Sequence, residues 1–96
     1  GKCELKILGP VDLAARFEWY ELAIQPGGVL ASEPHELGSK EHISVLSGTV
    51  TVQSGPSEKK VRHGESARYP VDVQHAISNA GKTVATALLV VEYAQQ

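Results

Sequence analysis

Short runs of strand-forming residues alternate with turn-forming residues along most of this chain. Glycine, proline, asparagine and serine gather at residues 25–28, 54–57 and 79–82, where they mark turns. Only residues 10–16 have a composition that suits a helical turn. Many short strands at this spacing predict an all-β domain, an antiparallel jelly roll of roughly six to ten strands whose two sheets limit exposed strand edges. The expected strands are residues 17–24, 42–46, 49–53, 66–69, 74–78 and 83–93.

The size of the chain predicts a single domain. With 96 residues there is room for one hydrophobic core. A hydrophobic content of 42% and a charged content of 21% are ordinary for a globular domain. We therefore expect one domain over residues 1–96. A lone cysteine, Cys3, excludes an internal disulfide, and no secretory or lipidation signal is visible, which favours a cytoplasmic location.

Charge and hydropathy exclude two classes of partner for this chain. A net charge of -2 and a pI of about 6.1 provide no basic face for a phosphate backbone, so these residues are not expected to contact nucleic acid themselves. The longest apolar run, residues 84–91, is interrupted by Thr86 and is far shorter than the roughly 20 residues of a membrane helix. We expect no membrane partner.

Two segments, residues 34–48 and 64–79, carry the most specific pattern in the sequence. Its marker positions are His35, Glu41 and Gly48 in the first segment and Gly64, Pro70, His75 and Asn79 in the second. At these spacings the segments resemble the two sequence motifs of the cupin family. Two positions depart from that family: Leu37 stands where the first motif has a second histidine, and Asp72 replaces the inner glycine of the second. The resemblance implies a small single-domain cupin, which is a double-stranded β-helix or antiparallel jelly-roll barrel.

Three of the marker residues form a candidate metal site. On a continuous strand His35 and Glu41 would lie about 20 Å apart at roughly 3.3 Å per residue, whereas ligands lie about 2.0–2.2 Å from one ion. The chain must therefore fold back between them, and Gly38 adopts positive φ at little cost. The resemblance implies that His35, Glu41 and His75 meet on the inner barrel wall. Two imidazoles and a carboxylate suit a divalent metal, Zn first and otherwise Fe, Mn or Ni.

Leu37 leaves two alternatives open for this site. A leucine in a ligand position removes a donor and is expected to add an apolar wall, so a bound metal would have three protein ligands and Leu37→His would tighten its binding. The alternative is a metal-free pocket in which His35 and His75 form hydrogen bonds with an organic ligand. A buried Glu41 would then need a hydrogen-bond partner or a proton.

Strand alternation predicts which residues share the inner face with these three side chains. Apolar walls with a few convergent polar groups are typical of a small-molecule pocket. Tyr69 suits either a pocket wall or the core. His42 has the opposite parity to Glu41, and His63 precedes a glycine in a turn, so neither is expected at the site. The expected ligand-lining residues are Ile43, Val45, Tyr69 and Ile77.

Both motifs further resemble the C-terminal sensor domain of XRE-type bacterial transcriptional regulators. Those proteins carry an N-terminal helix-turn-helix DNA-binding domain ahead of a single cupin, and no such segment stands in these 96 residues. The resemblance implies a domain that binds a small-molecule effector, while DNA contacts belong to the missing N-terminal domain. It also implies a homodimer, because two-fold regulators bind paired half-sites.

An enzyme is the alternative class. The three candidate ligands would then form the two-histidine, one-carboxylate set of a small metal-dependent dioxygenase or isomerase, in which the metal activates oxygen or water. No independent acid, base or nucleophile stands out in the sequence to support turnover. A metal-free structural cupin is the third hypothesis.

Overall fold

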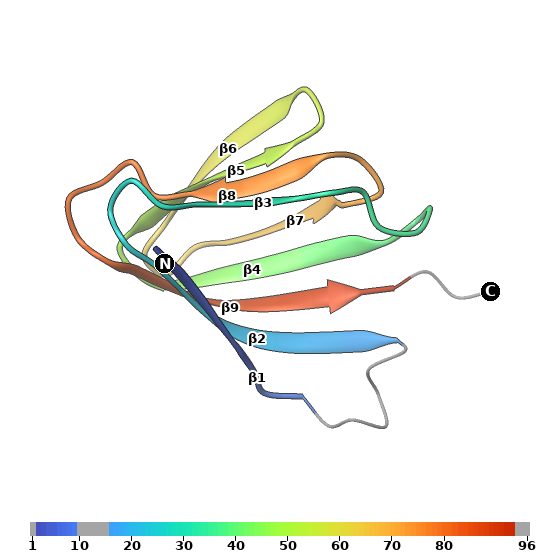
Figure 1. The fold of residues 1–96 in the computed structure, drawn as a ribbon, viewed down its shortest axis with the longest axis horizontal. Coiled ribbons are helices and arrows are strands. Elements are labelled where there is room, and N and C mark those ends of the chain that lie inside the picture. Colours follow the sequence, from blue (N-terminus) through green and yellow to red (C-terminus); the bar gives the residue numbers. More distant parts are fainter. Residues whose placement is uncertain (1, 10–15, 94–96) are drawn as a thin grey trace.

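The computed structural model describes residues 2–9 and 16–93, which fold into two antiparallel sheets that face each other (Figure 1). One sheet has five strands in the order β1-β2-β9-β4-β7, and the other has four in the order β3-β8-β5-β6. The strands are β1 (Cys3–Ile7), β2 (Phe17–Ile24), β3 (Val29–Ser32), β4 (Lys40–Ser47), β5 (Thr49–Ser54), β6 (Ser57–Arg62), β7 (Ser66–Pro70), β8 (His75–Ser78) and β9 (Ala85–Glu92). The described residues contain no helix, so the predicted antiparallel jelly roll is confirmed there.

The strand boundaries show what the sequence pattern detected. The predicted strand 17–24 coincides with β2, and the other predicted strands agree with the structure to within two residues at each end. Strands β1, β3 and β6 were not predicted. In β6 five of the six residues are exposed and only Val61 is buried, so this edge strand lacks the alternation of a half-buried strand. The helical turn expected at residues 10–16 lies outside the described residues, apart from Arg16.

The core lies between the two sheets and is built from regular rows of side chains. In the five-stranded sheet, Leu22 and Val45 both lie opposite Ala87, and all three are at most 2% exposed. The four-stranded sheet faces them with Val50, Val52, Val61 and Ile77. Each fully buried aliphatic side chain of this kind contributes about 1.5–3 kcal/mol relative to an exposed one.

Gly48 is the single residue between β4 and β5, where the chain passes from one sheet to the other. Its φ is +77°, a conformation that favours glycine. A Cβ at this position would lie 3.0 Å from Cα of Ala85. The glycine at the end of the first motif therefore permits both the sharp turn and the close approach of β9.

The loops divide the molecule into two ends. The β2–β3 and β8–β9 connections lie together on the left in Figure 1, and the β3–β4 and β7–β8 connections lie together on the right. At the left end Asn79 joins the β8–β9 connection to the end of β2: its side-chain amide donates to the carbonyls of Ile24 and Thr83 at 2.9 and 2.8 Å, and its Oδ1 accepts from the Gly81 N–H at 2.9 Å. Asn79 is 2% exposed, so water does not replace these bonds. The left end is thus closed by a buried side chain.

We predict that Asn79→Ala lowers the free energy of unfolding by about 3 kcal/mol, because it leaves buried backbone carbonyls without donors. Gln53→Ala is the matched control, since it removes an exposed amide side chain from β5 and should change stability by less than about 0.5 kcal/mol. Urea denaturation of the three proteins measures both values. Equal stability of the two variants would contradict the role assigned to Asn79.

Candidate metal centre

Three side chains from separate segments meet at the right-hand end of the barrel. Glu41 is the second residue of β4, His75 is the first residue of β8 in the opposite sheet, and His35 lies in the connection before β4. One potential ligand atom from each lies within 4.8 Å of the other two. Glu41 and His75 are 4% and 5% exposed, and His35 is half-buried. The structure therefore brings together all three residues that the motif spacing selected.

The turn that separates His35 from Glu41 comprises residues 36–39. Its Ser39 N–H donates to the Glu36 carbonyl at 3.0 Å, and Gly38 has a φ of +88°. None of the non-glycine residues among those described has positive φ. A hydrogen-bonded turn with positive φ only at its third residue is type II, which requires glycine or asparagine there. The predicted use of Gly38 to fold the chain back is thus observed.

Leu37 occupies the outer corner of this turn. Its side chain is 86% exposed, so it lines no part of the site. The expectation that Leu37 adds an apolar wall was wrong, because it was taken from the ligand position in the family motif. In this chain residues 36–39 form a turn, and the side chain of residue 37 is directed to solvent.

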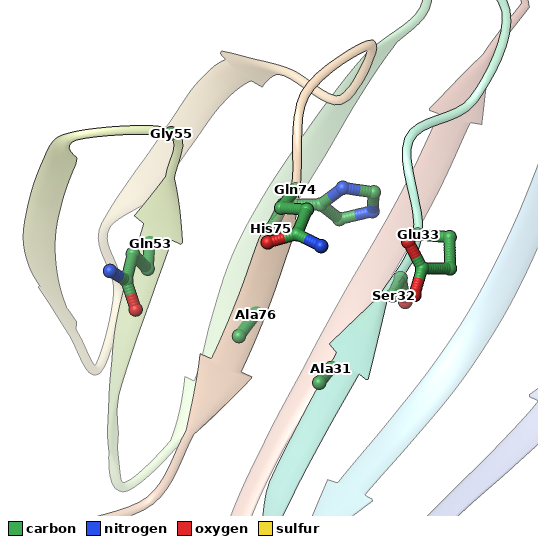
Figure 2. Close-up of a pocket in the computed structure, with 8 residues that line it drawn as sticks. All are labelled: Ala31, Ser32, Glu33, Gln53, Gly55, Gln74, His75 and Ala76. Carbon is green, nitrogen blue, oxygen red and sulfur yellow. The ribbon is translucent and has the colours of Figure 1, made fainter.

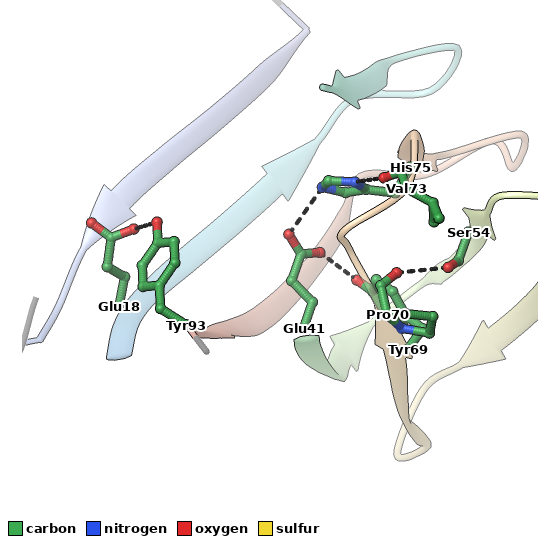
Figure 3. A network of polar contacts seen from close by, with 8 residues as sticks. All are labelled: Glu18, Glu41, Ser54, Tyr69, Pro70, Val73, His75 and Tyr93. Atoms are coloured by element: carbon green, nitrogen blue, oxygen red, sulfur yellow. Dashed lines mark hydrogen bonds and ion pairs between the residues drawn. The ribbon is translucent and has the colours of Figure 1, made fainter. Parts of the chain in front are cut away.

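His75 presents a free ring nitrogen to Glu41. Its Nδ1 lies 2.8 Å from the Val73 carbonyl and must donate to it, so the lone pair of the neutral ring lies on Nε2. That Nε2 is buried, has no hydrogen-bond partner, and lies 3.4 Å from Oε2 of Glu41 (Figure 3). A lone pair and a carboxylate oxygen repel each other unless positive charge lies between them. The pair therefore needs either a proton between its two atoms or a bound cation.

Tyr69 satisfies the other oxygen of Glu41. The two residues lie opposite each other on β7 and β4, and the tyrosine hydroxyl donates to Oε1 at 2.7 Å (Figure 3). Burial, together with the charge of Glu41, raises the pKa of Tyr69 well above its usual value near 10, so the hydroxyl stays a donor. A hydroxyl donor orients the carboxylate but does not neutralise it. Oε2 is left facing His75.

A second acidic group lies on the same inner face. Glu18 of β2 and Glu41 of β4 both lie opposite Val91 of β9, so a single strand separates them. The Tyr93 hydroxyl donates to Oε1 of Glu18 at 2.5 Å, and the Tyr93 ring meets the His35 ring edge-on, with centroids 5.8 Å apart. Sequence reasoning missed this cluster. The signal was present in the parity of β2, where Glu18 falls on the face of the buried Leu22.

The predicted pocket residues lie in or beside the core. Ile43, Val45 and Ile77 are at most 2% exposed, and Tyr69 is 8% exposed. Tyr69 also lines a cavity of about 100 Å³ between β5, β6 and β7. Contact of these four residues with a ligand stays a prediction.

A larger hollow, of about 470 Å³, lies over strands β3, β5 and β8 (Figure 2). Ala31 and Gln53 both lie opposite Ala76 in this sheet, in a row next to the buried Ile77 and therefore on the outer face. The hollow is thus mainly an outer-surface feature and not the expected interior pocket. Its lining residues are Ala31, Ser32, Glu33, Gln53, Gly55, Gln74, His75 and Ala76.

The two discounted histidines lie away from the site, as predicted. His42 faces the other side of β4, where its Nε2 lies 3.2 Å from Oε1 of Glu92. Arg68 contacts the same oxygen at 3.3 Å, and these two partners lower the pKa of Glu92. His63 is exposed in the turn between β6 and β7.

The three side chains His35, Glu41 and His75 have the chemistry of a metal site. Ligands bound about 2.0–2.2 Å from one ion can lie at most about 4.4 Å apart, slightly less than the 4.8 Å limit within which these atoms fall. His35 is the least buried of the three and is the side chain best able to move inward. The unpartnered Nε2 of His75 and the free Oε2 of Glu41 already point at each other. These residues fit a divalent ion.

The comparison with known proteins identifies the family of this chain. The profile of the cupin domain family matches residues 20–92, most of the chain. This chain belongs to the cupin family. The HTH-type transcriptional regulator SutR of Escherichia coli is 31% identical over 75 residues, which make up 78% of this chain and 42% of SutR. The cupin therefore spans less than half the length of that curated relative.

Several solved structures have a fold similar to that of this chain. The cupin domain of an XRE-family transcriptional regulator from Enterobacter cloacae has a TM-score of 0.89 and 24% identity, and the match covers 99% of this chain and 100% of that one. A sugar phosphate isomerase of the cupin superfamily from Silicibacter pomeroyi has a TM-score of 0.73 and 22% identity over 97% of this chain and 60% of that one. Regulators and enzymes thus share this fold. In the described part of this cupin, no helix has the length and apolar character needed to cross a membrane.

We predict that the 3 tyrosines of this cupin resist ionisation while it is folded. Burial is the largest cause for each: it raises the pKa of Tyr20 to about 12, with Glu18 adding to the shift, and raises the pKa of Tyr69 and Tyr93 above the usual value near 10. Above pH 10 the unfolded chain holds fewer protons on these tyrosines than the folded one does. The contribution of the tyrosines to the free energy of unfolding is therefore fully present below about pH 10, and it is lost as the pH rises toward 12.

Alkaline titration followed by tyrosinate absorbance measures this behaviour. The chain unfolded in urea is the control and should titrate near pH 10. A folded protein whose full tyrosinate signal also develops near pH 10 would contradict the burial of these hydroxyls.

Proposed function

We propose that this cupin is the effector-sensing domain of a bacterial helix-turn-helix transcriptional regulator, and that His35, Glu41 and His75 bind a divalent metal within it. The observation that carries the metal assignment is the buried Nε2 of His75, which has no hydrogen-bond partner and faces a carboxylate oxygen. The donor set favours Zn first, and Fe, Mn or Ni otherwise. When bound, such a metal supplies Lewis-acid positions to which an oxygen or nitrogen atom of a small molecule can bind.

The protein residues around this centre have separable tasks. Tyr69 orients Glu41 through Oε1, and the Val73 carbonyl fixes the tautomer of His75, so that one ligand atom of each is directed inward. Outer partners of this kind usually tune metal affinity. The apolar residues Ile43, Val45 and Ile77 would form the wall behind the effector, with Tyr69 at its edge.

The regulator assignment is supported by the XRE-family cupin domain and by the SutR relative. Because the chain spans 42% of SutR, we assign DNA binding to an N-terminal helix-turn-helix domain outside these residues. Effector binding would act by favouring one of two arrangements of a cytoplasmic homodimer, since a ligand shifts an equilibrium only through different affinities for its two states.

A small metal-dependent enzyme, of dioxygenase or isomerase type, is the second candidate. It is favoured by the same triad, because three protein ligands leave positions open for a substrate. The nearby Tyr69 hydroxyl does not supply a base, since its pKa is raised and it donates to Glu41. Native mass spectrometry of the purified protein with its co-purified ligand distinguishes the two functions: a sensor returns the ligand unchanged, and an enzyme converts it.

We predict that the purified domain binds Zn²⁺ and that His75→Ala weakens this binding by at least roughly 100-fold, because one of three ligands is lost. Isothermal titration calorimetry with Zn²⁺ alone measures the affinity. His63→Ala is the matched control, since that histidine is exposed in a turn away from the triad and its loss should leave the affinity unchanged. Circular dichroism should show the same strand content in all three proteins.

Absence of Zn²⁺, Fe²⁺, Mn²⁺ and Ni²⁺ binding by the parent domain would exclude the metal assignment. Zn²⁺ binding that is unchanged in both the His63 and the His75 variants would show that the metal binds elsewhere on the domain. In either case the buried pair of Glu41 and His75 would hold a proton or a cationic organic group between its free atoms.

We also predict that the domain forms a homodimer. Its mass by light scattering should approach twice the 10.2 kDa of the chain as concentration rises. A mass that stays at the monomer value across the accessible concentration range would contradict this part of the proposal.

A further inference from the structure

We infer that Asp72 is a positioning residue that holds the turn at residues 36–39 in place and thereby keeps residue 37 out of the metal shell. The inference rests on the proposed metal binding by His35, Glu41 and His75. It explains the two departures from the cupin motifs, Leu37 and Asp72, as one structural feature.

Three hydrogen bonds join the β3–β4 connection to the β7–β8 connection. The His35 N–H donates to the Val71 carbonyl at 2.8 Å, and the Val71 N–H donates to the Ser39 carbonyl at 3.0 Å. The third bond runs from the Gly38 N–H to Oδ2 of Asp72 at 2.9 Å. It is the only one of the three made by a side chain, so it is the one that the sequence at residue 72 controls.

The β7–β8 connection is itself firmly anchored. Val71 is 0% exposed, and the Pro70 carbonyl accepts from the hydroxyl of Ser54 in the opposite sheet at 2.6 Å. Asp72 is half-buried beside these contacts. The carboxylate therefore acts from a fixed position on the more exposed turn, and a hydrogen bond to an ionised acceptor is stronger than one between neutral groups.

The bond to Asp72 selects one orientation of the central peptide of the turn. In a type II turn this peptide joins the second and third residues, here Leu37 and Gly38, and its N–H is the Gly38 N–H that Asp72 accepts. Placing the side chain of residue 37 beside that of His35 would require an extended segment, in which alternate residues share a face. Such a segment would move the Gly38 N–H away from Asp72.

It follows that a histidine at position 37 does not reach the metal while Asp72 holds the turn. The 86% exposure of Leu37 fits a corner position with no task in the site. The centre is restricted to three protein ligands, and the remaining positions are left to the small molecule that the domain senses. Leu37→His alone is thus expected to leave metal affinity unchanged, which reverses the expectation drawn from the motif.

The test is a double-mutant cycle on the intact domain, with Leu37→His, Asp72→Ala and the combined variant. Zn²⁺ affinity is measured by competition with a chromophoric chelator, and Co²⁺ absorption reports the coordination geometry. We expect Leu37→His to stay within about twofold of the parent, and the combined variant to bind Zn²⁺ at least roughly tenfold more tightly than Asp72→Ala. Asp72→Asn keeps an acceptor oxygen. When it replaces Asp72→Ala in the cycle, Leu37→His should again change Zn²⁺ affinity by no more than about twofold.

A second measurement needs no metal. Hydrogen exchange of the Gly38 amide in the metal-free domain should be at least roughly tenfold faster in Asp72→Ala than in the parent, and close to the parent rate in Asp72→Asn. Unchanged Gly38 exchange in Asp72→Ala would overturn the inference. Tightening by Leu37→His alone, equal to that in the combined variant, would overturn it as well.

These outcomes are separate from the failure of the proposed function. If the parent binds no metal, the metal centre is excluded, and Gly38 exchange still decides whether Asp72 holds the turn. If the parent binds Zn²⁺ and Leu37→His alone tightens it, the metal centre stands and the positioning role of Asp72 is rejected.

Discussion

The buried carboxylate of Glu41 is the group on which the arrangement of this domain depends. Removing a carboxylate from water costs several kcal/mol even after relaxation, so the fold must supply partners for it. One oxygen accepts from Tyr69, which requires β7 to pair with β4 in the observed register. The other faces His75 of the opposite sheet, which requires the two sheets to close at this end. A single side chain thus links strand register, sheet packing and the chemistry of the site.

The two ends of the barrel differ in whether their buried polar groups have hydrogen-bond partners. Asn79 satisfies its side-chain amide entirely within the protein, through two carbonyls and one N–H, and so closes the left-hand end. At the right-hand end, His75 keeps a buried nitrogen without a partner. Buried polar atoms are seldom left in this state, so the contrast between the two ends supports the proposed metal site at the right-hand end.

The sequence was sufficient for the parts of the structure that depend on local alternation and motif spacing. The parity of β4 and β8 placed Glu41, Ile43 and Ile77 on the inner face, and Gly38 marked the turn. The orientation of Leu37 could not be obtained in this way, because it depends on a hydrogen bond that the Gly38 N–H donates to a residue 34 positions further along the chain. The edge strand β6 escaped detection because an exposed edge carries no buried alternation.

The charge of the inner face restricts what the site can accept. Glu18 and Glu41 lie one strand apart on the same face, and each receives a hydrogen bond from a tyrosine hydroxyl. Such donors lower the cost of burying a carboxylate but leave its charge in place, since the raised pKa of each tyrosine keeps its proton on the ring oxygen. The charge can be balanced by a proton, by a metal ion or by a cationic group. If the proposed metal supplies this charge, a neutral effector can bind beside Glu41 without leaving the carboxylate unbalanced.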